Sequence, residues 1–79
     1  MEKEITFKIV EHIGVLRGKE PGGWRRELNL VSWNDRPAKY DIRDWTPEHD
    51  KCSHGLTFSA DEMEKIAAWM NERKEKNNG

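Results

Sequence analysis

The start of a helix at residues 58–63 is the feature that most constrains the fold of this chain. Ser59 is suited to cap the helix, and Glu62 follows three residues later, so the two make a capping box. Phe58 and Met63 occupy the two positions of a hydrophobic staple around the same cap. The chain has 79 residues, which is enough for one domain, so the segments before this helix must supply the rest of that domain.

Those earlier segments alternate between apolar and polar residues, a pattern typical of strands. Strands are predicted over Ile5–Leu16, Trp24–Asn34, Ala38–Trp45 and Leu56–Phe58. Loops rich in Gly, Pro, Asn and Asp separate them at residues 18–23, 34–37 and 46–55. We therefore predict an α+β fold, in which a four-stranded curved antiparallel sheet is followed by one C-terminal helix. The ordered core is expected over residues 5–72, with a frayed tail over 73–79.

The alternation also assigns side chains to the two faces of the sheet. The face that the helix is expected to cover carries Ile9, Leu28, Leu30, Tyr40 and Ile42. The opposite face carries Arg25, Glu27, Asn29, Val31, Trp33, Lys39, Asp41, Arg43 and Trp45. One helix covers one face of a sheet, so the second face is predicted to be open.

The first strand is less regular than the others. Ile5, Phe7, Ile9, Ile13 and Val15 share one parity, while Thr6, Lys8 and His12 take the other. Val10 and Leu16 break this alternation. Either a partner subunit covers them, or a bulge shifts the register of the strand.

Composition bounds the stability and the setting of the chain. Hydrophobic residues make up 34% and charged residues 37%, so the core is thin, and pairing with a second copy would be a source of stability that composition alone does not establish. Cys52 is the only cysteine, which excludes an intrachain disulfide and favours a reducing cytoplasm. The charged start Met1–Glu4 predicts no signal peptide, and no apolar run is long enough to span a membrane.

The open face combines flat rings with cations, and two interpretations follow. Unpaired bases stack on such rings for about 1–3 kcal/mol each, while Lys and Arg track the phosphates. Alternatively, Trp33 and Trp45 are packing residues, and Lys39 and Arg43 are solvated charges. The net charge of −1, and the presence of acidic side chains on the same face, weigh against nucleic-acid binding.

Several segments resemble a known family. Lys39–Trp45 is similar to the strand of the transcriptional positive cofactor four family that carries an Asp-Ile-Arg motif followed by aromatics, and Gly55–Ser59 resembles that family's entry to its helix. Gly23–Asn29 and Val31–Asp35 resemble the second strand of its bacterial YdbC-like branch. Pro47, Glu48 and Lys51 fall in the family's polar loop, and the resemblance extends from about Phe7 to Trp69.

This resemblance implies a β-β-β-β-α homodimer that binds single-stranded DNA with little sequence preference. It implies a role in transcription regulation, replication or repair, contact with the corresponding machinery, and a cytoplasmic, nucleoid-associated location. Arg43 corresponds to the arginine of the motif, and Trp45 to the first aromatic after it. The family's stacking tryptophan falls at Thr46, so Trp45 or Trp33 takes that role, or the correspondence at this ring is structural only. The predicted nucleic-acid-binding set is Arg25, Asn29, Trp33, Lys39, Arg43, Trp45 and Lys51.

The same residues allow other functions to be considered. His49, Cys52 and His54 are zinc-ligand types in one short loop, but they fall short of four ligands unless a second chain contributes. Neither an orienting partner for a Cys52 nucleophile nor a phosphate-binding glycine loop is evident. We therefore predict no enzyme activity, no metal and no cofactor. A protein-interaction module that uses Trp69, and single-stranded RNA binding on the same sheet face, are the alternatives.

Overall fold

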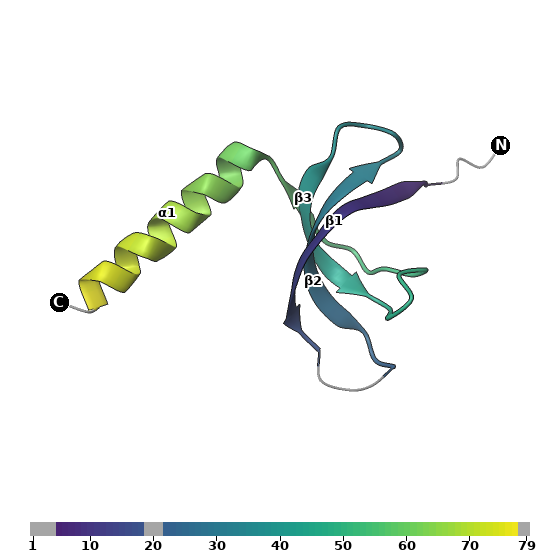
Figure 1. Ribbon diagram of the computed structural model, residues 1–79, viewed down its shortest axis with the longest axis horizontal. Coiled ribbons are helices and arrows are strands. Elements are labelled where there is room, and N and C mark those ends of the chain that lie inside the picture. Colours follow the sequence, from purple (N-terminus) through teal and green to yellow (C-terminus); the bar gives the residue numbers. More distant parts are fainter. Residues whose placement is uncertain (1–4, 19–21, 78–79) are drawn as a thin grey trace.

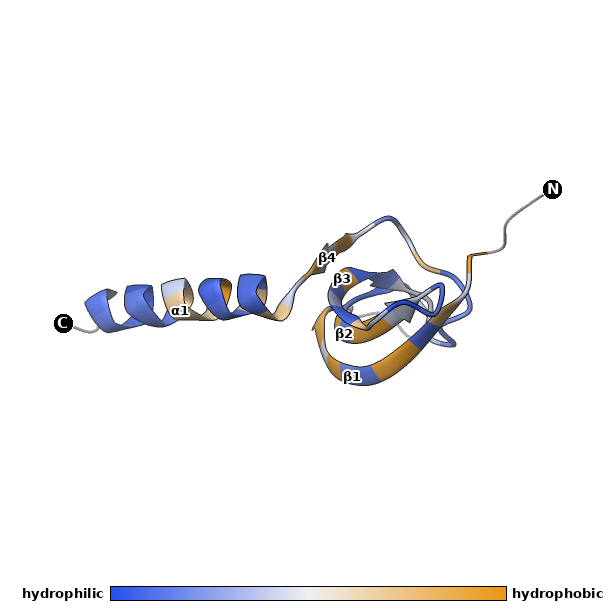
Figure 2. Ribbon diagram, turned by 90° about the horizontal axis from the view of Figure 1, so that it is seen from above, coloured by the Kyte–Doolittle hydropathy of each residue, from blue (hydrophilic) through white to orange (hydrophobic). Residues whose placement is uncertain are grey.

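The strands and the helix follow the predicted order in the computed structural model, which describes residues 5–18 and 22–77. The sheet consists of β1 (Phe7–Arg17), β2 (Arg25–Trp33), β3 (Lys39–Trp45) and β4 (Leu56–Phe58), and α1 (Ala60–Asn77) follows. The strands lie in the order β1-β2-β3-β4 with antiparallel neighbours; Figure 1 shows the first three of them, and Figure 2 labels all four. The predicted α+β fold is confirmed. The expectations for residues 1–4, for part of the 18–23 loop and for residues 78–79 lie outside the described residues.

The sheet curls, and we call the side that it encloses the inner face (Figure 2). The inner face carries the odd-numbered residues of β2 and β3 and the β1 residues paired with them, as the register requires. All five fully buried side chains among the described residues lie there: Glu27, Asn29, Val31, Asp41 and Trp45. The predicted division of β2 and β3 residues between two faces is therefore confirmed, but the core is small and mostly polar.

β1 departs from the prediction because its pairing with β2 shifts at three places. The shifts leave Val10, Ile13 and Leu16 as extra residues without a partner in the register. A one-residue shift moves the following side chains to the other face. His12 therefore pairs with Asn29 on the inner face, and Ile9 pairs with Val31 on the same face. The expectations that His12 and Ile9 lie on opposite faces, and that Ile9 lies with Leu28 and Leu30, were wrong.

The connection between β2 and β3 is a tight turn, as its Asn-Asp-Arg-Pro sequence predicted. Asn34 and Asp35 have φ values of 51° and 61°, and the Arg36 N–H donates to the Trp33 carbonyl at 2.9 Å. Two left-handed residues in succession define the type I′ turn that suits a β-hairpin. The turn follows directly after Trp33, the last residue of β2, and β3 begins at Lys39.

The loop between β3 and β4 folds back onto the end of β3. The Ser53 N–H donates to the Asp44 carbonyl at 2.9 Å, and the Thr46 N–H donates to the Lys51 carbonyl at 3.1 Å. Gly55 permits this close approach, because a Cβ there would collide with the Arg43 side chain and with the Ile42 carbonyl oxygen. His49 has a left-handed φ of 61° in the same loop.

The predicted capping box at the start of α1 is confirmed. The Glu62 N–H donates to Ser59 Oγ at 3.2 Å, and the Ser59 N–H donates to Glu62 Oε1 at 2.7 Å. No helix in the described part of the chain is both long and apolar enough to cross a membrane.

The course of α1 corrects the expectation that the helix covers one face of the sheet. The helix projects away from the sheet, and it contacts β3 and β4 but neither β1 nor β2, so it does not cover the sheet face of Leu28 and Ile42 (Figures 1 and 2). The reason is that it begins directly after the short strand at the sheet edge and continues outward. The helix runs to Asn77, in a segment whose Glu, Lys and Arg residues favour helix, and the expected fraying over residues 73–79 stays a prediction.

Candidate functional site

An aromatic cluster lies within the curl of the sheet. Trp33 and Trp45 are stacked, with ring centroids 6.2 Å apart and an interplanar angle of 16°. Phe7 of β1 tilts against both, at 5.6 Å from Trp33 and 5.0 Å from Trp45. Trp45 is completely buried, whereas Trp33 and Phe7 keep exposed surface. Trp45 is therefore the base of the cluster, and the other two rings form its accessible part.

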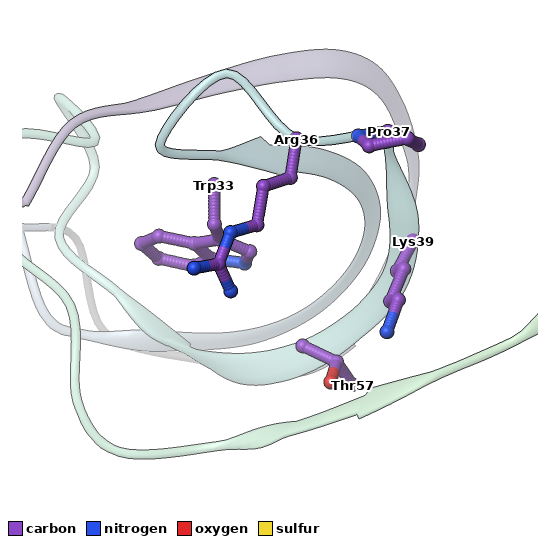
Figure 3. Close-up of a pocket in the computed structure, with 5 residues that line it drawn as sticks. All are labelled: Trp33, Arg36, Pro37, Lys39 and Thr57. Atoms are coloured by element: carbon purple, nitrogen blue, oxygen red, sulfur yellow. The ribbon is translucent and has the colours of Figure 1, made fainter.

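Two pockets meet at the Trp33 ring. The first, of about 150 Å³, is lined by Trp33, Arg36, Pro37, Lys39 and Thr57 (Figure 3). The second, of about 360 Å³, is lined by Ile5, Phe7, Trp33, Arg43, Cys52, Ser53 and His54. Trp33 is the one residue that lines both pockets, and we call the two pockets together the track, each pocket being one compartment of it. Each compartment combines an aromatic wall with a cationic side chain.

Asp41 joins Trp33 to Arg43 beneath this track. Its carboxylate is fully buried and accepts two hydrogen bonds from the Arg43 guanidinium, both at 2.7 Å, in a bidentate pair. The Trp33 indole N–H donates to the same carboxylate at 3.2 Å. The guanidinium carbon lies 4.4 Å from the Trp33 ring centroid, a cation–π contact.

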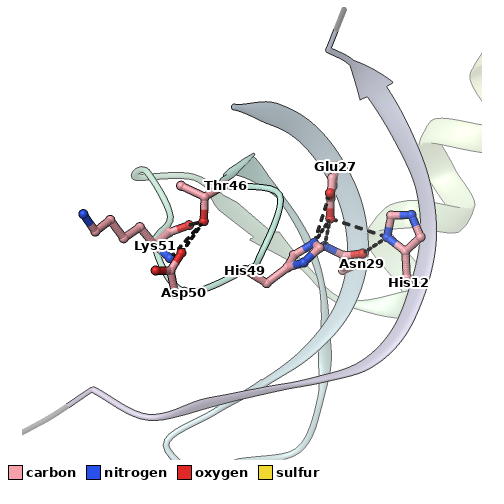
Figure 4. A network of polar contacts seen from close by, with 7 residues as sticks. All are labelled: His12, Glu27, Asn29, Thr46, His49, Asp50 and Lys51. Carbon is pink, nitrogen blue, oxygen red and sulfur yellow. Dashed lines mark hydrogen bonds and ion pairs between the residues drawn. The ribbon is translucent and has the colours of Figure 1, made fainter. Parts of the chain in front are cut away.

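A second buried carboxylate, Glu27, lies on the same face (Figure 4). The amide nitrogen of Asn29 donates to it at 3.0 Å, and the Nε2 atom of His49 lies 2.9 and 3.1 Å from its two oxygens. The Nδ1 atom of His12 lies 2.7 Å from the Asn29 side-chain oxygen and 3.4 Å from Glu27. Amide and carboxylate oxygens only accept hydrogen bonds, so His49 Nε2 and His12 Nδ1 each carry a hydrogen in this arrangement.

These contacts set the titration of Glu27. Burial by itself would raise its pKa, but the hydrogen bonds from Asn29 and His49, together with the positive charge of protonated His49 and His12, outweigh it. The pKa of the Glu27 carboxyl therefore lies below its usual value. The carboxyl stays ionised inside the sheet and is matched by its neighbours.

The predicted site residues are only partly brought together. Trp33, Lys39 and Arg43 line the two adjoining pockets. Asn29 and Trp45 lie on the inner face but have no exposed surface, so a base cannot rest on Trp45 in this conformation. Direct stacking on Trp45 remains a prediction that the geometry does not support.

The remaining two predicted cations lie away from Trp33. Arg25 pairs with Trp45 at the end of β2 that is remote from Trp33. Lys51 lines a separate pocket with Glu48 and Asp50, and Figure 4 shows its side chain directed away from the Glu27 network. In that loop Asp50 accepts a hydrogen bond from Thr46 at 2.6 Å, which lowers the pKa of the Asp50 carboxyl. Thr46 thus helps to organise the loop.

Three contributors to the site are absent from the set predicted by the sequence. Phe7 was expected on a strand but not in the site, and only its pairing with Trp33 reveals the contact. Arg36 was expected in a turn, although a cation between Trp33 and Lys39 was a usable signal. His54 was considered as a zinc ligand and was left out of the predicted binding set, although it lines the larger pocket.

The loop histidines and the cysteine have different surroundings. His49 faces Glu27, Cys52 pairs with Trp45 through an isolated β-bridge, and His54 lines the larger pocket. Within residues 5–18 and 22–77, no group of three His, Cys, Asp or Glu side chains is placed to hold a metal ion.

Comparison with known proteins adds one relative and no function. No family model matches the chain. An "uncharacterized protein" of Treponema pallidum (strain Nichols) is 43% identical over 68 residues, which cover 86% of this chain and 79% of that protein. At this identity and coverage, the chain belongs to the same family as the Treponema pallidum protein.

Proposed function

We propose that this chain binds single-stranded DNA along the inner face of its sheet, with Trp33 as the central stacking ring. The observation that carries the proposal is the position of Trp33 between two adjoining pockets. Arg36 and Lys39 line one pocket, and Arg43 lines the other. A strand that passes over Trp33 meets a ring for a base and cations for its phosphates in succession.

The chemistry of the track favours single strands over duplex. Trp33 and Phe7 offer ring surface to a flat partner, and any unpaired base has a face that can stack on it. Bases in a duplex already stack on one another, and duplex recognition in the major groove commonly uses an inserted helix or β-ribbon. These rings instead lie within the curl of the sheet, where Figure 3 shows the Trp33 ring.

The cations near Trp33 differ in how much charge they offer to a phosphate. Within the described residues, Arg36 and Lys39 are exposed and make no ion pair, whereas Arg43 is paired with Asp41. We therefore assign phosphate contacts first to Arg36 and Lys39. Arg25 and Lys51 would act only on a strand that extends beyond the two pockets.

The acidic side chains on the inner face do not oppose this proposal. Glu27 and Asp41 are 1% and 0% exposed, and both are matched by histidine or arginine. A phosphate on the track would meet neither carboxylate directly. The sequence placed these two acidic residues on the same face as the cations, which weighed against nucleic-acid binding. Their burial and pairing make that objection weak.

We also propose that two copies associate through the apolar side chains that the single chain leaves exposed. On α1 and β4, Trp69 and Met70 are each 59% exposed and Leu56 is 67% exposed. A groove of about 320 Å³ lined by Phe58, Ile66 and Trp69, among others, lies between the two elements. Apolar surface of this kind commonly marks an interface. A role in transcription, replication or repair, through the corresponding machinery, belongs to the same proposal.

Anisotropy titrations with labelled single-stranded DNA, duplex DNA and RNA of equal length test the binding proposal. Single-stranded DNA should bind more tightly than duplex, with little dependence on base sequence. Equal affinity for duplex would contradict the proposal, and preference for RNA would redirect it to a single-stranded RNA ligand.

The same titration separates the two roles around Trp33. Trp33→Ala should weaken binding by about 1–3 kcal/mol and leave the salt dependence nearly unchanged, because it removes stacking and no charge. Lys39→Ala should flatten the slope of log K against log salt by about 0.7 for each phosphate that the variant no longer neutralises. Lys74→Ala, near the far end of α1, is the matched cation control. Intact affinity in both pocket variants would place the site elsewhere.

Light scattering at tens of micromolar tests the association proposal. The expected mass is twice that of the 9.3 kDa chain. Trp69→Glu should shift the protein towards monomer, because a charge on the apolar surface opposes its burial. Trp24→Glu, at a similarly exposed ring outside α1 and β4, should not. A monomer mass for the wild type would refute self-association.

A further inference from the structure

Asp41 is the side chain that contacts both the proposed stacking ring and the cation beside it. Its carboxylate is fully buried and receives three hydrogen bonds, two from Arg43 and one from Trp33. Arg43 comes from the middle of β3 and Trp33 from the end of β2. The register pairs Asp41 with Asn29, so the Trp33 indole reaches back along the sheet to this acceptor.

We propose that Asp41 is a positioning residue for single-strand binding, which holds the Trp33 ring and the Arg43 guanidinium as one preorganised unit. This inference rests on the proposed function. Asp41 is too deeply buried to touch the strand, so it acts through the two side chains that it fixes.

The hydrogen-bond inventory of Arg43 shows what the unit offers to a ligand. A guanidinium has five N–H groups. Two of them bond to Asp41, and a third, on Nη1, donates to the Ser53 carbonyl at 3.3 Å. Among residues 5–18 and 22–77, the other two N–H groups have no hydrogen-bond partner, and Arg43 lines the pocket that it shares with Trp33. Their direction is set by the fork on Asp41.

The charge on Asp41 distinguishes positioning from simple electrostatics. A carboxylate next to a phosphate site repels the ligand, so its removal alone should tighten DNA binding. Loss of preorganisation has the opposite effect, because a freed arginine must be immobilised again when the strand binds. The two roles therefore predict opposite signs for the same substitution.

Asp41→Asn in the full-length chain is the main test, with anisotropy on single-stranded DNA at two salt concentrations. We expect binding to weaken roughly three- to tenfold, the range for immobilising one rotamer-rich side chain again. In an Arg43→Gln background the same substitution should have a smaller effect, since one of the two side chains through which Asp41 acts has already been replaced. Unchanged or tighter binding by folded Asp41→Asn would overturn the inference. So would an equal loss of affinity in both backgrounds.

Arg43→Lys tests the inference even if Asp41→Asn fails to fold. The lysine keeps the charge but cannot form the bidentate fork or lie flat over Trp33. We expect it to bind about as weakly as Arg43→Gln, and wild-type affinity would overturn the inference. If the wild type binds and both Asp41→Asn and Arg43→Lys bind as tightly as the wild type, the positioning role is rejected and the proposed function stands. No binding by the wild type rejects the proposed function and, with it, this inference.

Discussion

Replacing Trp45 with alanine should lower the free energy of unfolding by about 3–5 kcal/mol, the usual cost of truncating a buried aromatic core residue. Trp45 is 0% exposed and contacts the rings of Phe7, Trp33 and His49. Stability of a small domain is typically about 5–15 kcal/mol. The variant should therefore be close to unfolded at 37 °C, and urea denaturation followed by circular dichroism measures the loss.

Two further variants make this result specific. Trp45→Phe should cost less than alanine, because it keeps a ring and removes a buried indole N–H that finds no hydrogen-bond partner in the described part of the chain. Trp24→Ala, at a half-exposed ring, should change stability by about 0.5 kcal/mol or less. If Trp45→Ala instead keeps wild-type stability and loses only DNA affinity, Trp45 stacks on bases directly and the packing assignment is wrong.

The second large effect is expected at Glu27. Glu27→Gln should cost about 1.5–3 kcal/mol at pH 7, since glutamine removes the charge from a buried, hydrogen-bonded carboxylate and replaces one of its two acceptor oxygens with an amide donor that faces His49 Nε2. The pKa of Glu27 is lower in the folded chain than its usual value of 4.5. Its stabilising contribution is therefore fully present above about pH 4.5 and is lost as the pH falls through the folded-state pKa.

Urea denaturation of wild type and Glu27→Gln between pH 7 and pH 3 tests this expectation. The difference in unfolding free energy between the two proteins should narrow below pH 4.5, because protonation makes the wild-type carboxyl neutral, as the glutamine amide already is. Glu11→Gln, an exposed position on β1, is the matched control and should show no comparable cost at pH 7. A gap that stays constant across this range would show that the ionised carboxylate is not what stabilises the network.

Local signals in the sequence were sufficient for most of the secondary structure. The alternation in β2 and β3 gave the correct faces for Leu28 and Arg43, because side chains in a strand alternate strictly. Asn34 and Asp35 predicted the turn because both tolerate left-handed backbone. Ser59 and Glu62 predicted the helix start because the capping box involves only neighbouring residues.

The candidate site was predicted less completely. The sequence placed Trp33, Lys39 and Arg43 on one face, and the structure brings all three to the same pair of pockets. The sequence could not show which tryptophan is buried. Alternation along a strand assigns a side chain to one face of the sheet but does not show how deeply it is buried there. Trp45 and Trp33 have the same parity, yet only Trp45 lies wholly within the cluster.

What the sequence by itself determined about this protein is therefore the order of its elements, the faces of β2 and β3, and the start of its helix, all consequences of short-range geometry. Tertiary structure alone decided three other features. Bulges in β1, which depend on pairing with another strand, brought His12 to the inner face. Burial within the curled sheet, and the loop after β3 that sets His49 against Glu27, turned Glu27 and Asp41 from apparent repulsive charges into buried, paired groups. The path of the chain after β4 directed α1 away from the sheet, because a helix cap specifies where a helix begins and not what it packs against.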